Sequence, residues 1–498
     1  MWLPLFSLPS PGPIGGLGPV AHAFVDGLAA AGQSTWQILP PHPTTAGAGN
    51  SPYSGLSAFA LDPVLVSAEL LVEDGLVGSE EGGGGVATGR VDWEGARLRA
   101  ARLLAAAVAA LARSSDGRAE LEAFRVRHRA WLEDYALFRA LKRRFGGLSW
   151  VEWPAPLRGR DEEALEAARR DLGAEIEREI AAQALLDRQW RALRRGAREA
   201  GVELLGDLPF YVAHDSADVW SRPQLFSLDA DGRPQEVGGC PPDELSADGQ
   251  LWGQPVYRWA RQREEGFSWW LRRIERQLEL VDRVRLDHFR GLEATWNVPA
   301  GSATAAAGRW VPAPGDELVS ALVAGWPRRP FVAEDLGVLT DEVERLRRCL
   351  GAPATRVVQF GFGEDYPDGP HLPENAPADC LLYCGTHDND TLTGWLSGLA
   401  GATRDRVESY LNARGTDASA LAPRLVERVY ASAAAHVIAG CGDALGLGSE
   451  GRINRPGAPW GQWEWRLLAA DLAPALERLA RWTRRSDRRS GPAAPEAG

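Results

Sequence analysis

The stretch Val202-Glu203-Leu204-Leu205-Gly206-Asp207 shows the pattern that decides the fold of this chain. A short run of apolar, β-prone residues follows a helical pattern and ends in an aspartate, which is typical of a buried strand with a functional side chain at its carboxyl end. Similar runs, separated by helical sequence, recur at residues 281–289, 330–336, 355–360, 380–388 and 436–445. Strands and helices that alternate this often predict a parallel sheet, either open or closed.

Polar side chains gather where these strands are expected to end. Asp207 is followed along the chain by Arg285-Leu286-Asp287-His288, Glu334-Asp335 and Gly385-Thr386-His387-Asp388-Asn389-Asp390. A closed (β/α)8 barrel brings together groups from the carboxyl ends of many strands, whereas an open doubly wound sheet gathers its site near one switch point. We therefore predict an α/β fold, a (β/α)8 TIM barrel with helical and loop-rich insertions. No run in the sequence is convincing as its second strand.

Composition divides the chain into four parts. Residues 1–66 are rich in Gly, Pro and Ser around one strand-like run at 34–40, and we expect them to start the barrel with functional loops. Residues 67–200 are dense in Ala, Arg, Glu and Leu, which predicts a mainly helical insertion. Residues 201–485 are expected to supply the remainder of the barrel. The tail at 486–498 is predicted to be disordered.

Charge and cysteine content exclude several classes of protein. The 498 residues carry a formal net charge of -12, which disfavours nucleic acid and anionic membrane surfaces as partners. No stretch approaches the roughly 20 apolar residues of a membrane span, and the N-terminus lacks the basic start of a signal peptide. Five scattered cysteines favour a reducing compartment. We therefore expect a cytoplasmic protein.

Three acidic clusters at strand ends point to carboxylate chemistry, because neighbouring carboxylates in one cleft are costly unless they are used. Breaking a glycosidic bond needs one ionised carboxylate as nucleophile and one protonated carboxylic acid. A non-catalytic binding protein remains an alternative, and so does a metal-dependent hydrolase that uses His387, Asp388 and Asp390. The latter lacks the ligand spacing of known zinc motifs. Cys380 and Cys384 also lack a second ligand pair, and no metal site is predicted.

The motifs resemble those of family 77 glycoside hydrolases, the 4-α-glucanotransferases. The resemblance extends from about Leu8 to about Leu468, and its four signature runs stand in the expected order. They are Gly206-Asp207-Leu208-Pro209-Phe210-Tyr211-Val212-Ala213-His214-Asp215, Arg285-Leu286-Asp287-His288-Phe289-Arg290-Gly291, Ala333-Glu334-Asp335-Leu336-Gly337 and Gly385-Thr386-His387-Asp388-Asn389-Asp390-Thr391.

This resemblance implies roles for the acidic residues. Asp287 would be the nucleophile, Glu334 the acid and later the base, and Asp388 a stabiliser of the sugar hydroxyls in the transition state. Strand alternation places Arg285 on the same face as Asp287, where its guanidinium would keep the carboxylate ionised and oriented. Spacing leaves the choice between Glu334 and Asp335 open, and only the family pattern selects Glu334. Asp207 is expected to hold Asp287 and Arg285 in position.

Further residues are expected to bind glucan by the same resemblance. Tyr53 would stack on donor-side glucose from loops near the N-terminus, His387 would donate a hydrogen bond near the cleaved bond, and Asn454 would contact sugar. Residues 238–254 resemble a lid on the acceptor side, a polar loop that offers Asp243, Gln250 and Trp252. The role of His288 stays open.

The implied reaction is transfer of an α-1,4-glucan segment to the 4-hydroxyl of glucose or of a maltooligosaccharide, by a retaining double displacement without a metal or organic cofactor. A hydrolase of the α-amylase type remains an alternative. Three residues depart from the family pattern, Gly16, His42 and Gln462. They lie outside the three carboxylates, so they bear on outer subsites and leave the reaction class intact.

Overall fold

A parallel barrel forms the centre of the computed structural model, which describes residues 1–82, 88–242, 247–337, 339–458 and 460–488. Two sheets build it, with strand orders β1-β2-β5-β8 and β11-β10-β9. The strands are β1 (Thr35–Gln37), β2 (Glu203–Leu208), β5 (Arg283–Leu286), β8 (Phe331–Ala333), β9 (Ala354–Val357), β10 (Cys380–Tyr383) and β11 (His436–Ile438). The predicted α/β barrel is confirmed.

The two sheets join at two seams. At one seam the Ala333 N–H donates to the Pro353 carbonyl at 3.1 Å, and the Thr355 hydroxyl donates to the Ala333 carbonyl at 2.8 Å. At the other seam Trp2 makes parallel bridges to both Gln37 and Gly440. The segment at Trp2 therefore completes the set of eight strands. It is the first of them in chain order, and β1 is the second.

The run at 34–40, predicted to start the barrel, is thus its second strand. The unrecognised strand is the one around Trp2. It pairs by single bridges, and Pro4 stands two residues after Trp2, so it is too short to show the alternation by which strands are recognised.

Residues of β10 show why the barrel strands read as continuous apolar runs. Leu381 and Tyr383 belong to the cluster that fills the barrel, whereas Cys380 and Leu382 belong to the core between sheet and helices. Side chains alternate between the two faces of a strand, and both faces are buried in a parallel sheet. All four residues are therefore buried.

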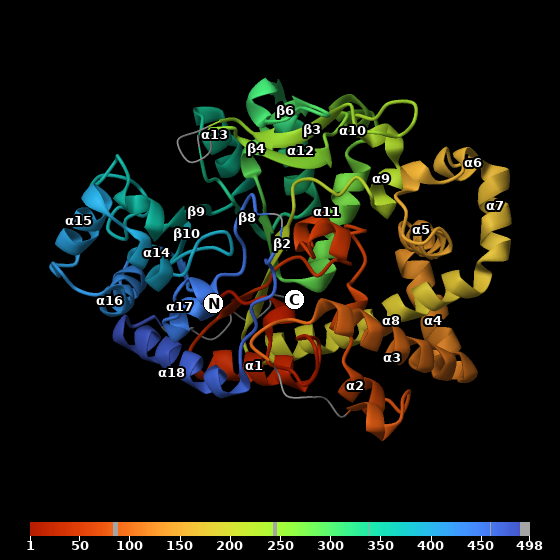
Figure 1. Cartoon of the computed structure of the whole chain (residues 1–498), viewed down its shortest axis with the longest axis horizontal. Helices are drawn as coiled ribbons and strands as arrows, with labels where there is room; N and C mark the ends of the chain where they lie inside the picture. Colours follow the sequence, from red (N-terminus) through yellow and green to blue (C-terminus); the bar gives the residue numbers. More distant parts are fainter. Residues whose placement is uncertain (83–87, 243–246, 338, 459, 489–498) are drawn as a thin grey trace.

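Helices surround the barrel, and α2 to α8, which lie between β1 and β2 in the chain, gather on one side of it (Figure 1). The helices before β2 are α1 (Pro19–Ala30), α2 (Ala68–Glu73), α3 (Trp93–Arg113), α4 (Ser115–His128), α5 (Leu132–Arg144), α6 (Ala155–Arg158), α7 (Glu162–Asp171) and α8 (Gly173–Glu199). The later helices are α9 (Ala217–Ser221), α10 (Trp259–Glu264), α11 (Ser268–Leu280), α12 (Gly315–Gly325), α13 (Asp341–Leu350), α14 (Leu392–Gly398), α15 (Gly401–Tyr410), α16 (Ala418–Tyr430), α17 (Cys441–Leu445) and α18 (Ala469–Arg485). In the described ranges, no helix is both long enough and apolar enough to cross a membrane.

Two glutamines of α8 fasten the N-terminal loops to the helical region. The Gln183 side chain accepts from the Leu61 N–H at 2.9 Å and donates to the Leu61 carbonyl at 2.8 Å. Gln189 pairs in the same way with Ser67, at 2.9 and 3.1 Å. Each side-chain amide thus bonds both the N–H and the carbonyl of one residue, as a neighbouring strand would. It thereby satisfies buried backbone groups that have no partner in a sheet.

The region predicted to be a polar lid loop begins and ends in a β-ribbon, within residues 238–242 and 247–254 that the structure describes. It belongs to an antiparallel sheet of order β4-β3-β6-β7, which lies beside the barrel (Figure 1). These strands are β3 (Glu236–Cys240), β4 (Gln250–Pro255), β6 (Ala294–Pro299) and β7 (Arg309–Pro312). Glycines obscured the ribbon in the sequence, but at Gly238 a Cβ atom would lie 2.3 Å from the Tyr211 ring, so close packing excludes a side chain there.

The start of the predicted tail is anchored. The Arg488 guanidinium donates to the carbonyls of Tyr430 at 2.6 Å and Ala434 at 2.8 Å, and also to that of Ser432. Residues 489–498, on which the rest of that prediction falls, lie outside the described residues. The division into domains stays a prediction.

Candidate active site

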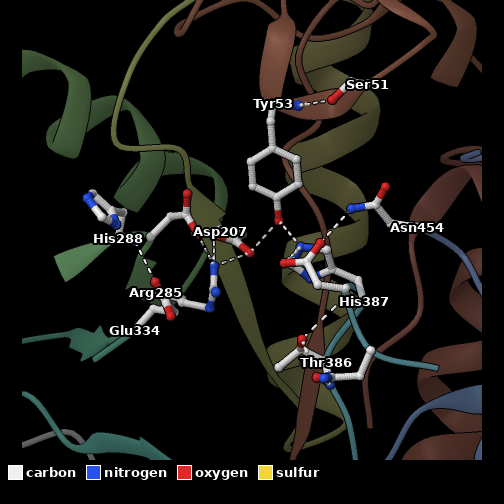
Figure 2. A network of polar contacts seen from close by, with 12 residues as sticks. Ser51, Tyr53, Asp207, Arg285, His288, Glu334, Thr386, His387 and Asn454 are labelled. Carbon is white, nitrogen blue, oxygen red and sulfur yellow. Dashed lines mark hydrogen bonds and ion pairs between the residues drawn. The ribbon is translucent and has the colours of Figure 1, made fainter. Parts of the chain in front are cut away.

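Six of the predicted site residues lie close together at one end of the barrel (Figure 2), namely Tyr53, Asp207, Arg285, Glu334, His387 and Asn454. Asp207 lies at the end of β2, Arg285 in β5, Glu334 directly after β8, and His387 and Asp388 in the loop after β10. Because all these strands are parallel, their carboxyl ends share one rim. The rim thus collects side chains that are far apart in the sequence.

Arg285 is the centre of this group. Its Nη1 atom donates to Asp207 at 2.7 and 2.8 Å and to Asp287 Oδ1 at 2.9 Å. Asp207 and Arg285 face each other across the β2–β5 pair, and both are buried. Burial raises the pKa of Asp207, and the Arg285 charge opposes that rise. Such a charge-assisted network fixes the direction of the Asp287 carboxylate, of which 27% is exposed.

Tyr53 links this group to the loop after β10. Its hydroxyl donates to Asp207 Oδ2 at 2.9 Å and lies 2.8 Å from His387 Nε2. The single hydroxyl proton points to Asp207, so Nε2 must carry a proton and donate to the tyrosine oxygen. The Tyr53 ring also stacks on His387, with centroids 5.2 Å apart, and lies 5.9 Å from the ring of Trp463.

Glu334 is held by the backbone of the neighbouring strand end. The His288 N–H donates to Glu334 Oε2 at 2.7 Å, and His288 has the left-handed backbone angles φ 47 and ψ 52. Burial raises the pKa of Glu334 to about 8, and nearby Asp287 adds to the rise while Arg285 opposes it. A carboxyl group with a pKa raised this far above its ordinary range favours the protonated form at neutral pH.

Asp335 points away from this group. Its carboxylate accepts from the Thr355 N–H at 2.7 Å and from Arg356 Nη1 at 3.2 Å, and it is buried. The neighbouring acid that spacing alone could not exclude is thus engaged with β9, while Glu334 faces the rim.

Asp388 is fixed from the C-terminal segment. Asn454 Nδ2 donates to Asp388 Oδ1 at 2.5 Å, and Arg452 donates to the Asp388 carbonyl at 2.8 Å. The Asp388 side chain remains 44% exposed, so a carboxylate edge is available to a ligand. By contrast, Asp390 accepts from the Ser449 hydroxyl at 2.6 Å. Among the described residues, no group of three His, Cys, Asp or Glu side chains is arranged to hold a metal ion.

The β-ribbon brings one of the predicted lid residues to the rim. The Trp252 ring meets His288 edge to face, with centroids 4.8 Å apart, and its indole N–H donates to Gln250 Oε1 at 3.2 Å. Asp243, the third predicted lid residue, lies outside the described residues.

Sequence reasoning missed three contributors to this site. The N–H of His288 acts through a left-handed turn that no sequence motif indicates, and Arg452, two residues before Asn454, is not among the predicted site residues. Trp463 also has positive φ, at 61°, and places its ring against Tyr53 and His387. Backbone geometry and ring packing depend on the tertiary fold, so only the charged Arg452 gave a signal.

The three departures from the family pattern have local explanations. A Cβ atom at Gly16 would lie 2.6 Å from the Leu65 carbonyl oxygen. His42 is buried between the Ala60 carbonyl and the Gln277 amide, both at 3.1 Å. Gln462 braces its loop by accepting from the Arg455 N–H at 2.8 Å and donating to the Ala458 carbonyl.

Comparison with known proteins gives one consistent result. The family model described as 4-alpha-glucanotransferase, of glycoside hydrolase family 77, matches residues 3–471. A 4-alpha-glucanotransferase of Thermus thermophilus is 44% identical over 94% of each chain. Another from Aquifex aeolicus is 42% identical over 93% of each chain, and the chloroplastic/amyloplastic one of Solanum tuberosum is 40% identical over 95% of this chain and 83% of its own.

A solved structure agrees with these relatives. The amylomaltase from Streptococcus agalactiae in complex with acarbose is 32% identical and superposes with a TM-score of 0.93, covering 98% of this chain and 99% of its own. The family model and the relatives each span nearly the whole chain. The protein is thus an enzyme of glycoside hydrolase family 77, the 4-α-glucanotransferases.

Proposed function

We propose that this 4-α-glucanotransferase works by a retaining double displacement, with Asp287 as nucleophile, Glu334 as acid and base, and Asp388 as transition-state stabiliser. One observation carries the proposal. Asp287 is paired with Arg285 at 2.9 Å, while the neighbouring Glu334 has its pKa raised to about 8 by burial. A retaining enzyme needs this division between one carboxylate and one carboxylic acid.

In the first half of the reaction, Asp287 Oδ attacks the anomeric carbon of the donor glucan. The bond to the leaving 4-oxygen breaks as that oxygen takes the proton of Glu334, which becomes a carboxylate. The exposed edge of Asp388, held by Asn454 at 2.5 Å, accepts hydrogen bonds from sugar hydroxyls as positive charge develops on the ring. The product is a glycosyl ester of Asp287 and a shortened glucan.

In the second half, Glu334 accepts the proton of the acceptor 4-hydroxyl. The acceptor oxygen attacks the anomeric carbon, and the Asp287 ester bond breaks to restore the carboxylate. The configuration is inverted twice and thus retained. Transfer exceeds hydrolysis where a bound acceptor has a higher effective concentration than attacking water.

The substrates we propose are α-1,4-glucan donors with glucose or maltooligosaccharides as acceptors. Tyr53, Asp207, Arg285, His387 and Asn454 would position the donor sugar, supported by the network around Arg285. Trp252, Gln250 and Asp243 would cover the acceptor. The reaction requires no metal or organic cofactor, because Glu334 supplies the proton transfer and Asp287 the nucleophilic attack.

We further propose that the enzyme acts in the cytoplasm on maltodextrin or on glycogen-derived chains. The free thiols of Cys349, Cys380, Cys384 and Cys441 support a reducing compartment.

Product analysis tests the proposal. Purified enzyme is incubated with maltotriose beside Asp287→Asn and a chelator-treated sample. We expect a ladder of longer maltooligosaccharides with glucose, absent in the variant and unchanged by the chelator. Glucose and maltose without longer products would contradict transfer, and loss of activity with the chelator would contradict the cofactor-free mechanism.

A further inference from the structure

His288 lies between the two carboxylates of the proposed mechanism. It follows Asp287 directly, and its N–H reaches Glu334 Oε2 at 2.7 Å. The residue has left-handed backbone angles, φ 47 and ψ 52. The turn is closed by the Gly291 N–H, which donates to the His288 carbonyl at 2.8 Å. The left-handed conformation is unfavourable for a residue other than glycine, so the surroundings must hold it.

The His288 ring provides that hold by packing. Its centroid lies 4.8 Å from Trp252 of the ribbon and 5.7 Å from Phe210, and both rings meet it edge to face. The Nε2 atom is buried and has no hydrogen-bond partner among the described residues. Burial lowers the pKa of His288 to about 4, so the ring is neutral when the enzyme works. One residue thus touches the acid through its backbone and the ribbon through its side chain.

We propose that His288 is a positioning residue that couples the ribbon carrying Trp252 to the acid–base group Glu334. A sugar bound under Trp252 presses on the His288 ring and keeps the turn that aims Glu334 at the reacting oxygen. A water molecule does not contact Trp252 in this way, so Glu334 is less well oriented when water is the acceptor. The coupling therefore favours transfer over hydrolysis, and it rests on the proposed function because it assigns proton transfer to Glu334.

The charged groups that influence the pKa of Glu334 all lie at the ends of barrel strands. Arg285 and Asp287 lie at the end of β5, and Asp335 follows Glu334 itself. The His288 N–H is a neutral donor that favours the ionised form of Glu334. Loss of this hydrogen bond therefore raises the pKa of Glu334 and moves the alkaline limb of activity to higher pH.

Paired substitutions at His288 test the turn. His288→Val disfavours the left-handed conformation because valine is β-branched, whereas His288→Asn tolerates it. Asn412→Val is the matched control, since Asn412 has φ 49 in an exposed turn outside the site. Each variant is assayed with maltotriose and with α-maltotriosyl fluoride, whose fluoride leaves as an anion without needing a proton from Glu334.

For His288→Val we expect roughly a tenfold to hundredfold lower kcat with maltotriose, and an alkaline limb moved upward. Fluoride release in the first turnover should fall much less, because Asp287 still attacks. His288→Asn should keep the position of the limb. Equal losses of His288→Val on both substrates, with an unmoved limb and a Tm like that of Asn412→Val, would overturn the positioning role.

A double-mutant cycle tests the link to the ribbon. His288→Asn and Trp252→Ala should each raise the ratio of hydrolysis to transfer, and the double variant should be no worse than the poorer single one, because both break the same contact. Fully additive effects would refute the coupling. If the wild-type enzyme transfers no glucan, the proposed function fails instead, and the two failures are thereby distinguished.

Discussion

The pair Glu334 and Asp335 shows how far one side chain determines chemistry. Glu334→Gln removes the proposed acid, and we expect kcat for maltotriose to fall by roughly 10²–10⁴-fold. Asp335→Asn alters a carboxylate that binds the Thr355 N–H and Arg356, so it should lower the free energy of unfolding by about 1–3 kcal/mol while kcat of the folded enzyme stays within a few-fold. Steady-state kinetics beside urea unfolding separates the two, and the opposite pattern would reverse our assignment.

The raised pKa of Glu334 predicts a pH dependence. Because the folded pKa is about 8 against an ordinary 4.5, kcat/KM should decline as pH rises through about 8. The folded state holds this proton more firmly than the unfolded state does, so the raised pKa also lowers stability progressively as pH rises from 4.5 to about 8.

Glu334→Gln has no such proton to lose. Its free energy of unfolding should therefore exceed that of the wild type increasingly across this window. A gap between the two proteins that is constant with pH would show that Glu334 is not protonated in the folded enzyme.

At the scale of elements, helix α8 stabilises the loops that lead to Tyr53 and the rim. Gln183→Leu leaves the Leu61 N–H and carbonyl without partners in a buried position. At roughly 1 to 3 kcal/mol for each of the two groups, the free energy of unfolding should fall by about 2 to 6 kcal/mol. Urea denaturation measures this effect. Gln224→Leu on the exposed surface is the control and should change stability by less than about 0.5 kcal/mol.

The elements also show where prediction from sequence ends. Runs such as 202–207 and 380–388 could be recognised because both strand faces are apolar and a polar residue follows, and the same signal indicated Asp207 and Asp388. The strand at Trp2, the Gly-containing ribbon and the left-handed His288 could not, because each depends on contacts with residues distant in sequence. Family resemblance selected Glu334 where spacing left two choices.

For the whole molecule, the seam at Trp2 determines whether the barrel is closed. The Trp2 indole N–H donates to the Gly385 carbonyl at 2.7 Å, and a Cβ atom at Gly440 would lie 2.7 Å from the Trp2 ring. Gly440→Ala should therefore lower the free energy of unfolding by about 1–3 kcal/mol through overpacking. It should also lower kcat by displacing Gly385, which precedes His387.

Thermal unfolding and maltotriose kinetics check this prediction. Gly47→Ala serves as the control, since a Cβ atom there would meet nothing within 4 Å. An unchanged Tm in Gly440→Ala would contradict a tightly packed seam.

The same seam joins residues that a ribosome makes far apart in time. Trp2 pairs with Gln37 early, but its other partner, Gly440, is translated about 440 residues later, which at roughly 5–20 residues per second means roughly 20–90 s. Throughout that interval one edge of the first strand lacks its neighbour and is open to pairing with other chains. Nascent chains of this enzyme therefore need protection from one another until the last strand emerges, so crowding on polysomes and chaperone supply should limit its yield.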